Sequence, residues 1–264
     1  MSAPRPVAAV PAILLVLIAV WEIAATRCNA HAVPGDDAWK EAAGVVRAGY
    51  QPGDLIVFAP EWADPIGRLH LGDLIPVDTA ARMDAARFGR IWEVSIRGAH
   101  HGDVAGLAPI AEDDRGGVRV ARYERAPAVV ISDLRDKLAG VQPSGGGRGP
   151  TLELAEVGFA PHRCIQIVPQ PNTPARLVFP QLALGSELVG YVGIADVFTR
   201  RDVRAPARLD VEIGGTVVAS ATAGVDDGWV RFSAPTTPGT ADVTVIASST
   251  AANRRICFAA EARR

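Results

Sequence analysis

The sequence predicts an N-terminal membrane helix, then a small Rossmann-like α/β domain with a mostly parallel sheet, then an antiparallel β-sandwich of the jelly-roll type. An apolar segment near the N-terminus predicts the first part. Alternating strand and helix patterns over 36–143 predict the α/β domain, because this order is typical of a helix-flanked parallel sheet. After a Gly-rich stretch at 144–150, interpreted as a linker, short strand patterns separated by turn residues predict a sandwich over 151–264.

The apolar segment at 1–32 has two interpretations. Its continuous apolar core, Val7–Trp21, is shorter than the roughly 20 residues of a spanning helix and reaches the upper limit of a signal-peptide core. Trp21 beside Glu22 favours a single-pass anchor in a bacterial cell membrane, because an indole prefers the membrane boundary. A small-residue motif ending at Ala32 favours cleavage and release instead. Both alternatives place the rest of the chain outside the cytoplasm.

The α/β domain is predicted to begin with a helix capped by Asp36 or Asp37 that buries one face from Trp39 to Val46. A turn at Gln51–Gly53 leads to a buried strand. Asp64-Pro65 starts a short helix with Ile66 and Leu69 directed inward. The remaining predicted elements are strands at Asp54–Ala59, Leu74–Val77, Arg90–Ile96 and Val118–Glu124, and helices at Thr79–Arg87 and Asp103–Leu107.

We expect neither nucleotide binding nor nucleic-acid binding. The strand in Gly53–Pro60 (GDLIVFAP) is followed by Glu61–Pro65 (EWADP), not by the glycine-rich turn that holds a phosphate. A net charge of −2 gives no electrostatic footprint for nucleic acid. We expect no cofactor and no metal.

One group of residues has the chemistry of an active site. His100, His101 and Asp103 follow the strand Arg90–Ile96, at the end where α/β domains place their sites. Two imidazoles and a carboxylate suit metal binding or acid–base chemistry. Adjacent histidines on a loop point in different directions, however, so a solvated loop is the favoured interpretation.

The cysteines of the C-terminal half lie in strand-like runs near its two ends. In an oxidising compartment Cys164 and Cys257 can join the first and last strands of one domain, and we predict that they form a disulfide. Two buried thiols are the alternative.

Part of the α/β domain resembles a known family. Residues 37–43 (DAWKEAA), 52–60 (PGDLIVFAP) and 90–94 (RIWEV) are similar to the soluble region that follows the last membrane helix of integral-membrane polyprenyl-phosphate-sugar glycosyltransferases of the protein-mannosyltransferase type. The resemblance covers about 37–97 and departs at Leu69-His70-Leu71, where the family carries an aromatic pair. It implies an extracytoplasmic accessory domain. No transferase activity carries over, because that family's catalytic acids lie between membrane helices that this chain lacks.

The second half resembles a different group. Leu188–Asp196 (LVGYVGIAD) and Asp227–Phe232 (DGWVRF) are similar to strands of galactose-binding-like jelly rolls, a fold common among carbohydrate-binding modules. The resemblance covers 155–262 and implies Trp229 as a platform on which a sugar stacks, with core packing the favoured alternative. Tyr191, Arg200 and Arg201 are candidates for a polar rim.

These expectations define one function and one alternative. We expect a membrane-anchored, non-catalytic extracytoplasmic protein of the bacterial envelope whose sandwich binds a glycan or a protein partner. The alternative is a glycosyltransferase-related, carbohydrate-active enzyme of the envelope with its site around His100, His101 and Asp103.

Overall fold

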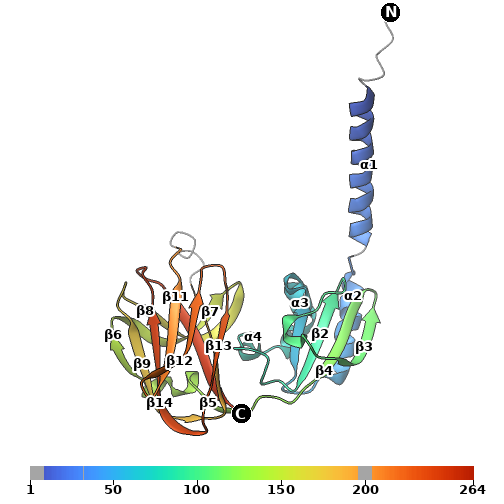
Figure 1. The fold of residues 1–264 in the computed structure, drawn as a ribbon. Helices are drawn as coiled ribbons and strands as arrows, with labels where there is room; N and C mark the ends of the chain where they lie inside the picture. The colour runs from blue at the N-terminus through green and yellow to red at the C-terminus, as the bar shows by residue number, and fades with distance from the viewer. Residues whose placement is uncertain (1–8, 32, 196–203) are drawn as a thin grey trace, which may run out of the picture. The chain divides into compact units, whose positions relative to one another are not determined.

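The structure is a computed structural model that describes residues 9–31, 33–195 and 204–264. The chain forms two compact units, and each unit consists of two segments that are not consecutive in the sequence (Figure 1). Unit 1 comprises Met1–Asp73 and Arg90–Glu124, and unit 2 comprises Leu74–Gly89 and Arg125–Arg264. The predicted boundary at 144–150 therefore differs from the observed one, because Leu74–Gly89 and the residues from Arg125 onward belong to the second unit.

The first helix is the apolar segment. Helix α1 spans Ala9–His31. Its stretch Val10–Cys28 is 19 residues long, with a mean hydropathy of 1.9, and is not buried against the rest of the protein. By length and composition it suits either a membrane span or a signal sequence.

Unit 1 contains a four-stranded sheet in the order β1-β2-β4-β3. Strands β1 (Leu55–Ala59) and β2 (Arg90–Ile96) are parallel, whereas β4 (Val118–Glu124) is antiparallel to both β2 and β3 (Pro109–Arg115). The prediction of a mostly parallel sheet is therefore wrong, and the sheet is mixed. The cause is β3, which is too acidic to read as a strand and lies at the exposed edge of the sheet. It joins β4 by a tight turn, so no crossover helix is required.

Helix α2 (Asp36–Gly49) buries Trp39, Ala42, Ala43 and Val46, as the apolar periodicity predicts. Helix α3 (Asp64–Leu71), preceded by the 3₁₀ turn η2 (Glu61–Ala63), differs from its prediction. Ile66 and Leu69 are exposed, and the buried residues are Gly67 and Leu71. The reason is the Phe58 ring of β1, which lies so close to Gly67 that a Cβ at this position would overlap it. The glycine face of the helix therefore meets the sheet.

The segment from Leu74 to Gly89 was predicted as a strand and a helix, and both predictions are wrong. After the 3₁₀ turn η3 (Gly72–Leu74), it contains a single helical turn, α4 (Val77–Ala80). Its later backbone groups bond to the sandwich, since Ala81 O accepts from Arg163 N–H and Met83 O accepts from the Trp229 indole. These external partners replace the intrahelical hydrogen bonds of the predicted helix.

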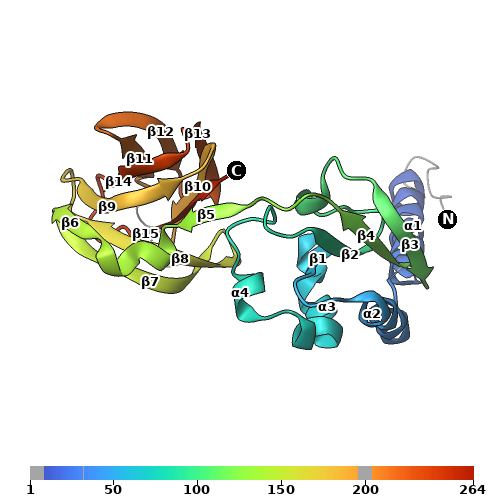
Figure 2. The same cartoon turned by 90° about the horizontal axis from the view of Figure 1, so that it is seen from below.

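The antiparallel sandwich of unit 2 is confirmed. Six strands form one sheet, in the order β13-β10-β15-β8-β7 with β5 beside β15, and five form the other, in the order β12-β11-β14-β9-β6 (Figures 1 and 2). The strands are β5 (Val130–Asp133), β6 (Gln142–Gly145), β7 (Gly147–Val157), β8 (Ala160–Pro169), β9 (Ala175–Leu184), β10 (Glu187–Ile194), β11 (Ala207–Ile213), β12 (Thr216–Ala223), β13 (Val230–Pro235), β14 (Gly239–Ser248) and β15 (Ile256–Arg263). Alternate residues of both sheets, among them Leu177, Phe179 and Phe258, fill the core between them.

The stretch predicted as a flexible linker lies inside this sandwich. Residues 144–150 end β6 and begin β7. Gly145, Gly147 and Gly149 have positive φ angles of 84°, 143° and 99°, and each passes close to the backbone of a neighbouring strand. These glycines therefore permit close strand packing, which sequence composition alone does not distinguish from flexibility.

Candidate functional site

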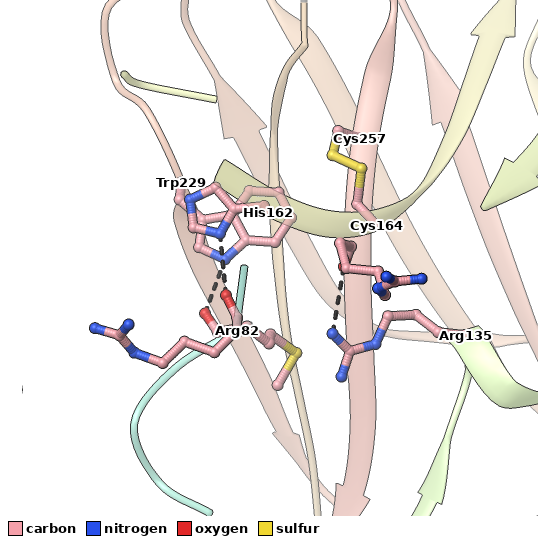
Figure 3. Close-up of a disulfide and its surroundings, with 8 residues drawn as sticks. Arg82, Arg135, His162, Cys164, Trp229 and Cys257 are labelled. Carbon is pink, nitrogen blue, oxygen red and sulfur yellow. Dashed lines mark hydrogen bonds between the residues drawn. A yellow bond between two sulfur atoms is a disulfide. The ribbon is translucent and has the colours of Figure 1, made fainter. Parts of the chain in front are cut away.

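The disulfide between Cys164 and Cys257 is confirmed, with a Cα–Cα distance of 5.5 Å (Figure 3). Both residues are fully buried. The ladder between β8 and β15 is short and joins Ile165–Ile167 to Ile256–Phe258, after which β5 takes the place of β8 beside β15. The disulfide therefore joins β8 to β15 where their hydrogen bonds end, on the sheet face that points away from the core.

Trp229 lies beside this disulfide, in a stack of rings. Its ring centroid is 4.4 Å from that of His162 and 5.9 Å from that of Tyr191, and the rings are close to parallel. The indole Nε1 donates to Met83 O over 3.0 Å, and His162 Nδ1 lies 3.1 Å from Arg82 O (Figure 3). Of the four residues predicted to bind ligand, Trp229 and Tyr191 are thus brought together, while Arg200 and Arg201 lie outside the described residues.

The ring contacts limit what Trp229 can bind. A sugar on the indole face that His162 covers would have to displace the imidazole. Burial lowers the pKa of His162 to about 4, so the ring is neutral near neutral pH. Since a carbonyl only accepts, the neutral imidazole must carry its proton on Nδ1 to donate to Arg82 O. This hydrogen bond and that of Trp229 fasten residues 82–83 to the sandwich.

A buried ionic network fastens the same segment at a second point. Glu261 is fully buried, and its carboxylate lies 2.7 Å from Arg87, 3.1 Å from Arg135 and 2.8 Å from Arg263. Arg263 also donates to both oxygens of Asp84 over 2.9 Å. Although burial raises the pKa of Asp84, these bonds hold it below its ordinary value. The charges of the network are therefore paired with one another.

A groove lies on the same outward face of the six-stranded sheet. Glu153 of β7 pairs with Cys164 of β8, and Thr151 pairs with Gln166, so these side chains share the face of the disulfide. The groove has a volume of about 590 Å³. It is lined by Arg148, Gly149, Thr151, Glu153, Leu154, Ala155, Glu156, Gln166, Val168, Ala195 and Arg255.

The polar side chains of this groove are mostly unused by the protein itself. Among the described residues, those of Thr151, Glu153, Gln166 and Arg255 make no hydrogen bond or ion pair, while Arg148 donates to Asn253 Oδ1 over 3.0 Å. None of these residues is among the predicted site residues. The available signal was weak: polar residues alternate along β7, as they do on any solvated strand.

In unit 1 the histidine loop contacts a buried carboxylate that is not among the predicted site residues. Glu93 of β2 is fully buried. Its Oε2 lies 2.8 Å from Arg119 Nη1, 3.0 Å from the Tyr123 hydroxyl and 3.2 Å from His100 Nδ1, and its Oε1 accepts from His101 N–H over 2.6 Å. Burial is the main cause that raises the pKa of Tyr123, so its phenol stays a donor to Glu93. The acidic residue between the apolar Trp92 and Val94 in the strand RIWEVSI was the signal for this cluster.

The two predicted histidines have different partners. His100 is largely exposed and meets Glu93, whereas the His101 ring accepts a hydrogen bond from the backbone N–H of Asp103 over 3.1 Å and caps the 3₁₀ turn η4 (Gly102–Val104). The helix predicted at 103–107 is reduced to this turn. Within the part of the chain that the structure describes, no three His, Cys, Asp or Glu side chains are grouped to hold a metal.

Comparisons with known proteins give only weak similarities. No family profile and no curated protein matches the chain. A structure of CBM51-2 in complex with GlcNAc and INT domains from Clostridium perfringens ZmpB is 16% identical over 57% of this chain and 35% of its own length, with a TM-score of 0.37. CsCBM6-3 from Clostridium stercorarium in complex with cellobiose is 12% identical over 50% of this chain and 94% of its own, with a TM-score of 0.30.

A third structure, CBM51 from Clostridium perfringens GH95 in complex with methyl-galactose, is 12% identical over 46% of this chain and 86% of its own, with a TM-score of 0.31. This chain thus spans about a third of the length of the ZmpB structure. Scores this low assign no function. The resemblance of residues 37–97 to glycosyltransferases receives no support from these comparisons.

Proposed function

We propose that this is a membrane-anchored extracytoplasmic binding protein whose sandwich holds a glycan in the groove beside the disulfide. The observation that carries the proposal is the set of four unpaired polar side chains, Thr151, Glu153, Gln166 and Arg255, on one sheet face. Polar groups that converge in a concave site without internal partners are available to a ligand.

The chemistry of these groups suits a saccharide. Arg255 only donates and ionised Glu153 only accepts, while Gln166 and Thr151 do both, so the groove matches hydroxyl groups that act in either role. Two arginines and two glutamates line it, so it carries no excess charge that would select an anion. Apolar atoms of Ala155 and Val168 are available to the C–H faces of a sugar ring.

The strands beneath the groove support pre-organisation. β7 and β8 are paired along most of their length, and the disulfide ties β8 to β15. Binding to side chains on a rigid sheet loses little conformational entropy. Tyr191 and Trp229, on the same sheet, remain a proposed additional contact. Anchoring by α1, or secretion after its cleavage, is proposed from its length and composition.

The test is a glycan-array screen of the full chain in detergent, followed by calorimetry with the best ligand. A fragment starting at residue 151 is unsuitable, because it lacks β5, β6 and the segment 74–89. Arg255→Ala and Glu153→Gln should each weaken binding about 10–100-fold, since one charged hydrogen bond contributes roughly 1.5–3 kcal/mol.

The control is Arg208→Ala, which removes another exposed arginine, from the other sheet. It should leave the dissociation constant unchanged. Absence of any glycan ligand, or equal loss in the control, would overturn the proposal.

A second candidate, an envelope carbohydrate-active enzyme, is favoured by one observation. The Glu93 carboxylate faces His100 Nδ1 at 3.2 Å and orients an otherwise exposed imidazole, which is an arrangement that a general base requires. Hydrolysis of an envelope glycan that disappears in His100→Ala, while glycan binding by the groove persists, would support this candidate.

A further inference from the structure

Unit 1 exposes an apolar stripe on η2 and α3. Trp62, Ile66 and Leu69 are 59%, 42% and 77% exposed. They are separated by four and three residues, so they lie along one face of the helical segment. The inward face of α3 is made by Gly67 and Leu71 instead. The stripe is therefore apolar surface that the described core of unit 1 does not use, and an exposed apolar stripe is a candidate interaction site.

The stripe lies close to the point where the apolar helix joins unit 1. Figures 1 and 2 show α3 beside α2. His70, the neighbour of Leu69, places its Nε2 3.2 Å from Oδ1 of Asp36, the first residue of α2. Only residues 32–35 separate Asp36 from His31, the last residue of α1. Even a fully extended chain spans at most about 18 Å over this interval.

The residue beside the stripe suits a lipid headgroup region. The guanidinium of Arg97 lies over the Trp62 ring, 5.8 Å from its centroid. Indole side chains prefer the boundary between hydrocarbon and water, and an arginine at that depth can meet lipid phosphates while its stem covers apolar surface. An apolar face with adjoining arginine is the composition of segments that lie in the plane of a membrane surface.

We propose that Trp62, Ile66 and Leu69, with Arg97, form a second contact of unit 1 with the phospholipid surface beside α1. This inference rests on the proposed anchoring by α1. A bilayer is the occupant that the short connection favours. The connection holds this surface near the end of the spanning helix, and therefore near lipid. The contact would limit the orientations of the unit on the membrane.

The test uses spin labels on the full chain in vesicles of phosphatidylcholine and phosphatidylglycerol. The exposed free cysteine is first removed as Cys28→Ser, and the buried disulfide is left in place. Single cysteines are then introduced as Leu69→Cys in the stripe, Leu17→Cys in α1 and Gln51→Cys. Gln51 follows the C-terminal end of the 14-residue α2, about 20 Å from Asp36, and is the aqueous control.

Accessibility to oxygen, which concentrates in lipid, is compared with accessibility to a water-soluble nickel chelate. Labels at 17 and 69 should favour oxygen and the label at 51 should favour nickel. Adding Trp62→Ser and Ile66→Ser should abolish the oxygen preference at 69 and leave that at 17 unchanged. These substitutions affect exposed side chains, so they do not disturb the core.

Each other outcome has a distinct meaning. If the label at 69 behaves like that at 51 while 17 reports lipid, the inference is wrong and the anchoring stands. If 17 is aqueous, the anchoring fails, and the inference fails with it. If 69 is shielded from both reagents, the stripe is covered by protein, such as a second copy of the chain, and the lipid contact is excluded.

Discussion

Removal of the Cys164–Cys257 bond should destabilise the sandwich by about 4–5 kcal/mol. The two cysteines are 93 residues apart, and closing a loop of this length in the unfolded chain removes roughly 15 cal/mol/K of entropy, which gives this free energy near 25 °C. The ladder between β8 and β15 joins only three residue pairs, so hydrogen bonds alone hold these strands over a short distance. The bond thus stabilises a junction that the sheet itself supports weakly.

Native-state hydrogen exchange of the full chain measures this effect for each unit separately. Cys164→Ala, Cys257→Ala and the double variant all lose the same cross-link and should lower protection in β9, β10 and β15 by similar amounts. Peptides from β1, β2 and β4 in unit 1 should keep their protection, and Cys28→Ser should change neither unit.

Loss of less than about 1 kcal/mol in the double variant would refute the loop-entropy reasoning. A loss that differs strongly between the two single variants would instead show that side-chain packing, and not the cross-link, provides the stability.

Three other predictions concern single side chains. Glu93→Ala should destabilise unit 1 by about 3–5 kcal/mol, because it leaves the donors around this buried carboxylate unpaired; thermal unfolding that is unchanged would contradict this. The pKa of His162 is lowered to about 4 in the folded protein, against about 6.5 in the unfolded chain. Between these two pH values only the unfolded chain binds the proton. The free energy of unfolding should therefore decrease as the pH falls from 6.5 to 4. His162→Phe, which retains a ring against Trp229, should flatten this part of the pH–stability curve by up to roughly 3 kcal/mol, and equal curves would disprove the assignment. Gly67→Leu should displace the Phe58 ring and destabilise unit 1 by roughly 1–3 kcal/mol in urea unfolding. The control is Gly44→Leu, because a Cβ at this exposed position would have no neighbouring side chain within 4 Å, and this change should not destabilise the unit.

Predictions that depend on local pattern agree with the structure. The apolar face of α2 follows from the spacing of Trp39, Ala42, Ala43 and Val46, because a helix repeats every 3.6 residues wherever it packs. The strands of the sandwich follow from period-two alternation and from turn residues. The disulfide was predicted because the two cysteines lie in strands near the ends of one domain, and a sandwich can bring such strands together.

Predictions that depend on a partner distant in sequence do not agree. The orientation of α3 depends on Phe58, whose ring takes the place of a side chain at Gly67, and nothing within Asp64–Leu71 indicates this. The segment 74–89 has helix-compatible residues, but its carbonyl groups accept from Arg163 and Trp229, which follow it by about eighty residues or more.

The sequence alone therefore determined the apolar helix, the antiparallel sandwich and the cysteine pair, because each depends on the periodicity or chemistry of nearby residues. Only the tertiary structure decided to which unit the segment 74–89 belongs, which face of α3 is exposed to solvent, and which polar side chains lie together. The groove is lined by Glu153 of β7, Gln166 of β8 and Arg255, the residue before β15. Strand pairing across the sheet brings these residues together, and pairing is set by the packing of the whole domain and not by any one strand.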